Sequence, residues 1–312
     1  MYLGIDVGGT TVKAGLIDNN GELTWSDSRP TRAEDGKEAS VEAIVNFLEE
    51  ILAARADIKS IGVGVPGIVG AGGIVRVAPN LPGWLDVPLG EMLRGKTGIR
   101  IAVENDANAA AVAELLGGAG VGVKNFIYAT LGTGVGGGII IDGKLYTGAT
   151  GGAGEIGHMI IDHLDAPVSD ERGYRAGVVE EKTGRAQIIK LAKKIAAKRR
   201  DSALNGVEDL DVLNISEAIY EGDWAAIETF KLVGYYLGLA FASAMNLLDI
   251  HYLIIGGGIS QAHPMLFDCI ADTIKKRALP HIAKDFELKP AKFLQETGIY
   301  GAAFLGKLEM EA

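Results

Sequence analysis

The alternation of apolar and polar residues predicts strands that lead into glycine turns. Residues 3–18 read LGIDVGGTTVKAGLID, in which two apolar runs are joined by Gly8, Gly9 and Thr10. This pattern is typical of a β-hairpin whose tight turn exposes backbone N–H groups to an anion. A P-loop is not indicated, because the chain here lacks the G-x-x-x-x-G-K-[ST] spacing and does not run from a strand into a helix.

The same strand–turn–strand pattern returns at residues 127–142, IYATLGTGVGGGIIID. A third glycine cluster, Gly256–Gly258, follows an apolar strand and precedes a predicted helix. Two related hairpins about half a chain apart suggest an internally duplicated, two-lobed α/β protein with mixed sheets. Each lobe would offer one turn to a phosphate chain that lies between the lobes.

The remaining periodicities complete an alternating α/β chain. Residues 66–84 are predicted to form a long glycine-rich loop, and residues 143–158 a second loop. Strands are predicted at 23–28, 58–65, 99–103, 249–255 and 286–293, and helices at 37–55, 107–116, 178–198, 215–221, 224–248, 264–278 and 299–308.

Composition and charge exclude several classes of protein. The 312-residue chain carries a net charge of -10, which argues against a nucleic-acid surface. Its single cysteine, Cys269, excludes an intramolecular disulfide and a multi-cysteine zinc site. The first strand begins almost at Met1, and the apolar stretch 234–250 ends at Asp249 and continues into a strand, so we expect neither a secretory leader nor a membrane span. The expected location is the cytoplasm.

Polar side chains at strand and loop ends are the candidates for chemistry. Asn105 and Asp106 follow a buried strand, at the sheet edge where ligands of α/β proteins bind. Asp106 also stands where a helix N-cap is expected. Glu155 and His158 close a glycine loop, and one turn could aim both at a common point. At the end of the predicted loop 66–84, Asn80 and Trp84 could offer an amide and an apolar face to a sugar. The alternative is a surface turn with a packed tryptophan.

These segments together resemble the ROK (repressor, open reading frame, kinase) family of sugar kinases, from end to end of the chain. The family belongs to the actin-like ATPase superfamily, with a ribonuclease H-like fold of two lobes and a cleft between them. The Asn-Leu-Pro-Gly-Trp segment is most similar to the glucokinase branch. The motifs that carry the resemblance are DVGGT at 6–10, VPG at 65–67, NLPGW at 80–84, ENDANA at 104–109, LGTGVGGG at 131–138, GEIGH at 154–158 and GGG at 256–258.

The resemblance implies an ATP-dependent phosphorylation of the C6 hydroxyl of a hexose, with glucose expected first. Asp106 is then the catalytic base, and Asp6 faces Mg²⁺ through water. The sugar-binding residues that the resemblance implies are Gly67, Asn80, Asn105, Glu155, His158 and Glu180. The nucleotide-binding residues are Asp6, Gly8, Gly9, Thr10, Lys13, Thr133, Gly134, Gly257 and Gly258.

The resemblance also implies two lobes that close around the substrates. The small lobe is expected at 1–115 plus 298–312, and the large lobe at 116–297. Hinges are expected near 114–124 and before the final helix. A homodimer is the family expectation.

One segment departs from the family pattern. The family's zinc loop, Cys-x-Cys-Gly-x-x-Gly-Cys-x-Glu, corresponds to ERGYRAGVVE at 171–180, which keeps the Gly-x-x-Glu end and has lost all three cysteines. His163 and Asp165 are conceivable substitutes, but the motif relies on soft thiolates. We expect no structural zinc, and the role of Glu180 is the least secure of the set.

Several alternatives stay open at this point. Within the class, N-acetylmannosamine, N-acetylglucosamine or fructose could replace glucose, because the sequence does not show the size of the pocket. The family's transcriptional repressors carry an N-terminal helix-turn-helix domain, for which a hairpin that starts at Leu3 leaves no room. A non-catalytic sugar or nucleotide sensor is the third reading.

Overall fold

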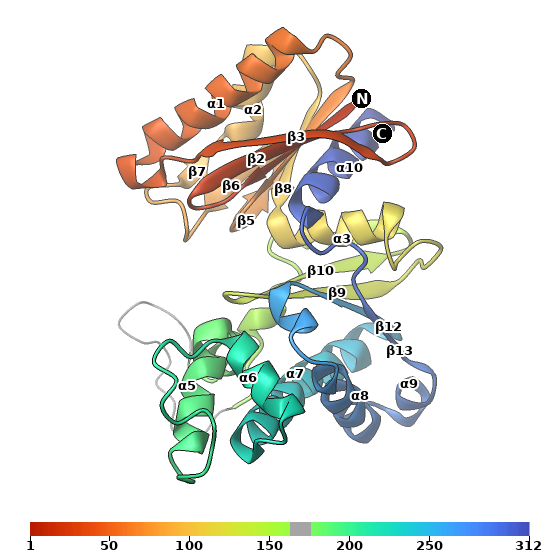
Figure 1. The fold of residues 1–312 in the computed structure, drawn as a ribbon. Coiled ribbons are helices and arrows are strands. Elements are labelled where there is room, and N and C mark those ends of the chain that lie inside the picture. Colours follow the sequence, from red (N-terminus) through yellow and green to blue (C-terminus); the bar gives the residue numbers. More distant parts are fainter. Residues whose placement is uncertain (163–175, 312) are drawn as a thin grey trace. The chain divides into compact units, whose positions relative to one another are not determined.

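The chain forms two compact units in a computed structural model that describes residues 1–162 and 176–311 (Figure 1). The first unit comprises Met1–Lys124, Gly138–Gly154 and Lys292–Ala312, and the second comprises Asn125–Gly137 and Glu155–Ala291. Residues 116–124, 138–154 and 292–297 therefore group with the first unit. The two functional lobes outlined from the sequence stay a prediction.

A five-stranded mixed sheet forms the centre of the first unit. Its first three strands are antiparallel neighbours, and β1, β4 and β8 run parallel. The predicted hairpin and its third antiparallel strand are confirmed. In the order β3-β2-β1-β4-β8, the strands are β3 (Leu23–Pro30), β2 (Thr11–Ile17), β1 (Tyr2–Val7), β4 (Ser60–Val65) and β8 (Ile101–Asn105).

Helices bury the two apolar faces of this sheet. The predicted amphipathic helix is confirmed as α1 (Lys37–Ala54), and its Ile44 and Leu48 join the core around Ile5 and Val63. The last helix, α10, packs against β1 and β4, as Figure 1 shows within this unit. The other helices of the first unit are α2 (Leu89–Thr97), α3 (Asp106–Gly117) and α10 (Thr297–Glu311), with 3₁₀ turns η1 (Ala33–Asp35) and η2 (Ala71–Gly73).

The second sheet repeats the topology of the first. A three-strand meander is again followed by two parallel strands in the order β11-β10-β9-β12-β13. The repeated order confirms the internal duplication expected from the two hairpins. The strands are β11 (Lys144–Tyr146), β10 (Val135–Ile141), β9 (Phe126–Leu131), β12 (Tyr252–Gly256) and β13 (Glu287–Pro290).

The second unit is built around α7 (Trp224–Leu248), which packs against four other helices. Asp223 caps its N-terminus by accepting from the Ala226 N–H, 3.0 Å away. By length and composition α7 could cross a membrane, but half of its most apolar window is buried inside the protein, as in a core helix. The remaining helices are α4 (Val179–Thr183), α5 (Arg185–Ala196), α6 (Val212–Tyr220), α8 (Met265–Arg277) and α9 (Pro280–Asp285), with 3₁₀ turns η3 (Ile156–His158) and η4 (Gly258–Gln261).

Three sequence expectations were wrong in detail. Residues 66–84 are not a continuous loop, because β5 (Ile68–Gly70) and β6 (Ile74–Val77) pair in a small sheet with β7 (Leu85–Val87). Strands of three residues are too short to show a periodicity. The helix expected at 178–198 is broken at Gly184, whose extended backbone separates α4 from α5. The loop expected at 143–158 contains β11 and η3.

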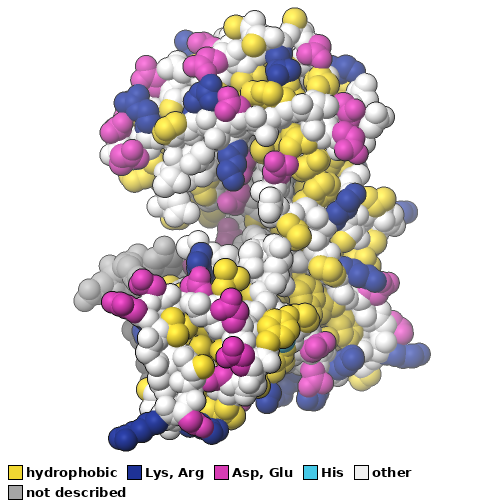
Figure 2. Space-filling view, viewed as in Figure 1, with side chains coloured by type: hydrophobic (Ala, Val, Ile, Leu, Met, Phe, Trp, Pro, Cys, Tyr) yellow, Lys and Arg dark blue, Asp and Glu magenta, His cyan; other side chains and the backbone are white. Residues whose placement is uncertain are grey.

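Acidic and basic side chains are interspersed on the face of the molecule shown in Figure 2. Apolar side chains appear there singly and in small groups. On this face, Asp and Glu side chains are distributed among Lys and Arg side chains and do not form one acidic patch.

Candidate active site

Three parallel strands bring acidic side chains to one edge of the first sheet. In the parallel register Asp6 lies opposite Gly64, and Gly64 lies opposite Glu104. Asn105 is the last residue of β8 and Asp106 the first residue of α3. The carboxyl ends of parallel strands meet at the edge where α/β proteins bind ligands. The first unit therefore gathers Asp6 and the 104–106 segment at one edge of its sheet.

Asn105, not Asp106, caps helix α3. The Asn105 side-chain oxygen accepts from the N–H groups of Ala107 (2.9 Å) and Asn108 (3.0 Å). The expected N-cap position is thus wrong by one residue. Asp106 is exposed in the first turn, where its Oδ1 accepts from the Ala107 N–H at 2.8 Å and the Asn105 Nδ2 at 3.0 Å. These two bonds fix the orientation of the carboxylate at the positive end of the helix.

All hydrogen-bonding positions of the Asn105 side-chain amide are occupied by groups of the protein. Its Nδ2 donates to Asp106 and to the Gly67 carbonyl oxygen, 2.9 Å away, while its oxygen accepts two N–H bonds. An amide has two donors and two acceptor sites, so a sugar hydroxyl would have to displace one of these partners. Gly67 has φ 103°, and a Cβ there would overlap the Val77 carbonyl oxygen. The Gly67 backbone therefore has a conformation that only glycine adopts easily, and in this conformation its carbonyl oxygen accepts the bond from Asn105.

The first hairpin turn brings an acid and a base together. Asp6 and Lys13 are cross-strand partners in the β1–β2 ladder. Burial raises the pKa of the Asp6 carboxyl, and the Lys13 charge lowers it in part. The turn is closed by the Gly8 N–H, which donates to the Thr11 carbonyl at 2.9 Å, and the Thr31 hydroxyl donates to the Gly8 carbonyl at 2.7 Å. Thr10 is exposed at its tip.

The two candidate side chains of the Asn80–Trp84 segment differ in burial. Asn80 is exposed, and its backbone lies against Gly9 of the hairpin turn. Trp84 is buried, and its indole N–H donates to the Ser40 hydroxyl on α1 at 2.8 Å. Of the two readings of this segment, the structure supports a packed tryptophan, while the amide of Asn80 stays at the surface beside the turn.

In the second unit, Glu155 and His158 flank a single 3₁₀ turn. Their Oε2 and Nε2 atoms lie 3.8 Å apart, and both side chains are exposed. The next residue, Met159, accepts from the Val179 N–H at 3.0 Å. This bond places the turn next to the start of α4, which carries Glu180. One turn thus brings the Glu155 and His158 side chains close together, as their spacing predicted.

Glu180 is bound to the second glycine turn. Its Oε2 accepts from the Val135 N–H at 3.0 Å, and a Cβ on Gly134 would overlap the same oxygen. The turn itself is closed by the Gly132 N–H, which donates to the Gly134 carbonyl at 2.9 Å. Thr133 is exposed at the tip. Glu180 therefore stabilises this turn through a hydrogen bond to one of its carboxylate oxygens.

Gly257 and Gly258 lie at the end of the strand next to that turn. Gly256 is opposite Thr130 in the parallel β9–β12 register, and Gly257 has φ 83°. The Ser260 hydroxyl donates to the Gly257 carbonyl at 2.7 Å and stabilises the loop. The second unit thus brings Thr133, Gly134, Glu155, His158, Glu180, Gly257 and Gly258 to neighbouring segments. Residues 171–175 of the altered zinc loop lie outside the described residues, as do the suggested ligands His163 and Asp165.

Comparison with known proteins decides the family. Residues 2–309 match the ROK family. The chain belongs to the ROK family. A glucokinase from Halalkalibacterium halodurans is 34% identical, with 98% of this chain and 94% of the relative aligned.

Two solved ROK structures show how widely this fold is used. A ROK glucokinase from Streptomyces griseus in complex with glucose and AMPPNP is 30% identical, with a TM-score of 0.81 and 98% and 99% of the two chains covered. A ROK transcriptional regulator, a homologue of E. coli MLC, is 26% identical, with a TM-score of 0.89 over 99% of this chain and 78% of the regulator. Kinases and regulators thus share this ROK fold.

Sequence reasoning placed no role on Glu104, the residue before Asn105 in this ROK chain. Its Oε1 accepts from the Asn105 N–H at 2.8 Å and from the Asn108 Nδ2 at 3.0 Å. Glu104 belongs to strand β8 and Asn108 to helix α3, so this pair depends on the strand–helix turn and has no periodic signal in the sequence. Glu104 therefore helps to position the backbone that presents Asp106.

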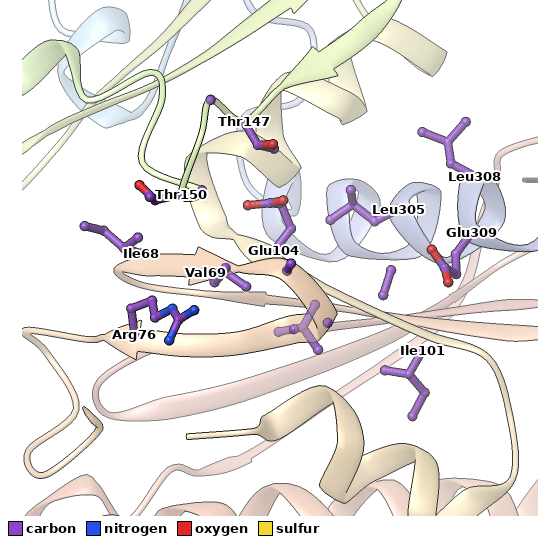
Figure 3. A pocket seen from close by; sticks show the side chains of 18 of the residues that line it. Ile68, Val69, Arg76, Ile101, Glu104, Thr147, Thr150, Leu305, Leu308 and Glu309 are labelled. Atoms are coloured by element: carbon purple, nitrogen blue, oxygen red, sulfur yellow. The ribbon is translucent and has the colours of Figure 1, made fainter. Parts of the chain in front are cut away.

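Glu104 also projects into a cavity of about 860 Å³ in the first unit (Figure 3). Ile68, Leu305 and Leu308 give this cavity apolar walls, and Arg76 and Thr150 add polar groups. The lining residues include none of the predicted sugar or nucleotide ligands. This cavity is therefore not the predicted substrate site, although Glu104 connects it to Asn105 and Asp106.

Burial in this wall raises the pKa of Glu104, and the two hydrogen bonds lower it only in part. As pH rises above the ordinary carboxyl pKa of about 4.5, the unfolded chain ionises this group while the folded state still holds the proton. Stability is therefore lost as pH rises towards the raised folded-state pKa. Glu104→Gln keeps an acceptor oxygen and removes that charge. We expect the variant to be more stable than wild type near pH 7.5, by a margin that shrinks towards pH 5 in urea unfolding.

The matched control is Glu309→Gln, at an exposed acid in the lining of the same cavity. Its stability difference from wild type should be small at both pH values. A Glu104→Gln margin that does not change with pH would show that burial of the charge is not what matters at this position.

Proposed function

We propose that this chain is an ATP-dependent hexose kinase that transfers the γ-phosphoryl group of ATP to the C6 hydroxyl of glucose. The observation that carries the proposal is the Asp106 carboxylate, held by Asn105 and the Ala107 N–H at the same sheet edge as the Gly8–Thr10 turn. The similarity to glucokinases, one of them solved with glucose and AMPPNP, supports glucose as the acceptor and ATP as the donor.

In this proposal Asp106 is the general base. Its carboxylate takes the proton of the C6 hydroxyl while that oxygen bonds to the γ-phosphorus and the bond to the leaving ADP oxygen breaks. The transition state of phosphoryl transfer is loose, so the proton leaves late and an aspartate is a sufficient base. Catalysis then depends on positioning, which Asn105 supplies through its four hydrogen bonds.

The sugar hydroxyls would be bound by the polar groups that the family resemblance implies. Asn80 and the Gly67 backbone would contribute from the first unit. Glu155, His158 and the second oxygen of Glu180 would contribute from the second. A contact from Asn105 itself would require one of its present bonds to be exchanged, so we assign it first to the positioning of Asp106.

The phosphate groups would be bound by backbone N–H groups and hydroxyls of the two glycine turns. Gly8, Gly9 and Thr10 with the Lys13 ammonium form one set, and Thr133 with Gly134 the other. Gly257 and Gly258 would contact the adenosine. Such local donors explain how a protein of net charge -10 binds an anionic nucleotide.

The fold family implies Mg²⁺, and Asp6 fits this ion. Its carboxylate lies at a strand end beside the first turn, and Mg²⁺ prefers carboxylate oxygens and retained waters. Bound there, Mg²⁺ would neutralise charge on the phosphates. Because burial raises the pKa of Asp6, a nearby cation would favour its charged form.

A second class of function is favoured by the regulator structure, which shares this fold. In that reading the chain is a non-catalytic sensor of sugar or nucleotide. Within the kinase class, N-acetylmannosamine, N-acetylglucosamine or fructose would keep the mechanism and change only the acceptor.

The test is an ADP-release assay with MgATP and a panel of sugars. The panel contains glucose, mannose, fructose, N-acetylglucosamine, N-acetylmannosamine and allose. We expect the highest kcat/KM with glucose. Turnover with an N-acetylated sugar alone would correct the acceptor, and ATP binding without turnover of any sugar would favour the sensor.

A further inference from the structure

Asp249, His251 and His281 converge on one point of the second unit, and none of them has a role assigned above. Asp249 ends α7 in a left-handed backbone conformation, with φ 51°. This turn directs the chain into β12, and His251 immediately precedes that strand. His281 is the second residue of α9, thirty positions further along. Three chemistry-bearing side chains from two distant segments thus meet at the surface.

Both imidazoles point at the same carboxylate oxygen. The Asp249 Oδ1 lies 3.3 Å from the His281 Nε2 and 3.5 Å from the His251 Nε2. All three atoms lie within 4.8 Å of one another. In a tetrahedral site with metal–ligand bonds of about 2.1 Å, neighbouring ligand atoms stand about 3.4 Å apart. The two distances to the Asp249 Oδ1 are close to this spacing.

The three ligand atoms are held in place by the fold and are open to solution. The Glu287 N–H donates to the His251 carbonyl at 2.8 Å, and the Leu279 N–H donates to the Asn246 Oδ1 at 2.8 Å. These bonds fix the two segments that carry the histidines. The side chains keep 76%, 35% and 59% of their surface exposed for Asp249, His251 and His281. A metal ion can therefore reach them.

We propose that Asp249, His251 and His281 form a binding site for a divalent first-row transition metal, with Zn²⁺ as the best match. Two imidazoles and one carboxylate suit Zn²⁺, Co²⁺ or Ni²⁺ better than Mg²⁺, which prefers oxygen ligands alone. Water would complete the coordination.

The bound ion would link the α7–β12 connection to α9. This end of β12 is opposite to the end that carries Gly257, and the five residues between span about 15–20 Å. The ion is thus a structural link and lies far from the chemistry proposed for the glycine turns. We expect metal loading to raise the thermal unfolding temperature and to leave sugar phosphorylation unchanged.

The test is a titration of the metal-free full chain with Co²⁺, followed by absorbance, and with Zn²⁺, followed by calorimetry. We expect one equivalent of metal per chain. We expect affinity to fall by at least about 100-fold in His281→Ala and by at least about 10-fold in Asp249→Asn. His158→Gln is the matched control, because His158 is also exposed and lies 3.8 Å from a carboxylate oxygen. It should bind the metal as wild type does.

Thermal unfolding with Zn²⁺ or with a chelator separates a binding defect from a folding defect. Wild type and His281→Ala should unfold at similar temperatures in chelator, and only wild type should gain stability from Zn²⁺. Equal Zn²⁺ affinity in wild type and His281→Ala would overturn the proposal. Equal loss of affinity in His158→Gln would overturn it too, by moving the metal to the other histidine.

Discussion

Asp106→Asn is expected to reduce kcat by about 10²–10⁴-fold, the usual contribution of a positioned general base. Asparagine matches aspartate in shape and accepts the Ala107 N–H bond that holds the carboxylate now. The substitution therefore removes the proton acceptor with little effect on helix α3. Sugar affinity, measured by calorimetry, should change by less than about tenfold, and the thermal unfolding temperature should change little.

Asp268→Asn is the matched control for this substitution. Asp268 is an exposed aspartate in the first turn of α8, in the other unit, and has no proposed role. It should keep wild-type kcat. If Asp106→Asn also retained most of the wild-type kcat, Asp106 could not be the base, and the proton would have to leave to water or to another group.

Gly67→Ala is expected to destabilise the fold and to impair turnover together. Gly67 has φ 103°, and a methyl group there would overlap the Val77 carbonyl oxygen. Left-handed strain and steric overlap together cost about 3 kcal/mol, or about 5 °C in unfolding temperature for a chain of this size. A backbone shift at Gly67 would also weaken the 2.9 Å bond from Asn105 that orients Asp106. Circular dichroism and the ADP assay would measure both effects.

Gly72→Ala separates these two causes. Gly72 has a similar φ of 75°, but a methyl group there would meet nothing within 4 Å. It should cost only the backbone strain, about 1 kcal/mol, and keep kcat near wild type. Equal stability losses in the two variants would show that contact with Val77 is unimportant.

The sequence predicted those parts of the fold that have long local patterns. The helix expected at 224–248 has the bounds of α7, because an apolar stretch of 25 residues lies between two aspartates, Asp223 as N-cap and Asp249 as the left-handed end. Both glycine hairpins were predicted because each joins two apolar runs. The repetition of this hairpin predicted the internal duplication, which the repeated strand order of the two sheets confirms.

Features that depend on tertiary contacts could not be predicted from local pattern. The strands β5 to β7 have three or four residues each and exist because they pair with one another. One of the four bonds of the Asn105 side chain is to the Gly67 carbonyl, which lies 38 residues earlier. The convergence of His281 with Asp249 depends on the packing of α9. Sequence reasoning therefore proposes residues for chemistry, but it does not give the contacts that orient them.

The most direct test of the proposed reaction is to identify its product. Wild-type chain would be incubated with MgATP and glucose, and the products would be analysed by ³¹P and ¹H NMR. We expect one glucose phosphomonoester, with its phosphate on the C6 oxygen, for each ADP formed. ADP without a sugar phosphate, or a phosphate on another carbon, would contradict the proposed reaction.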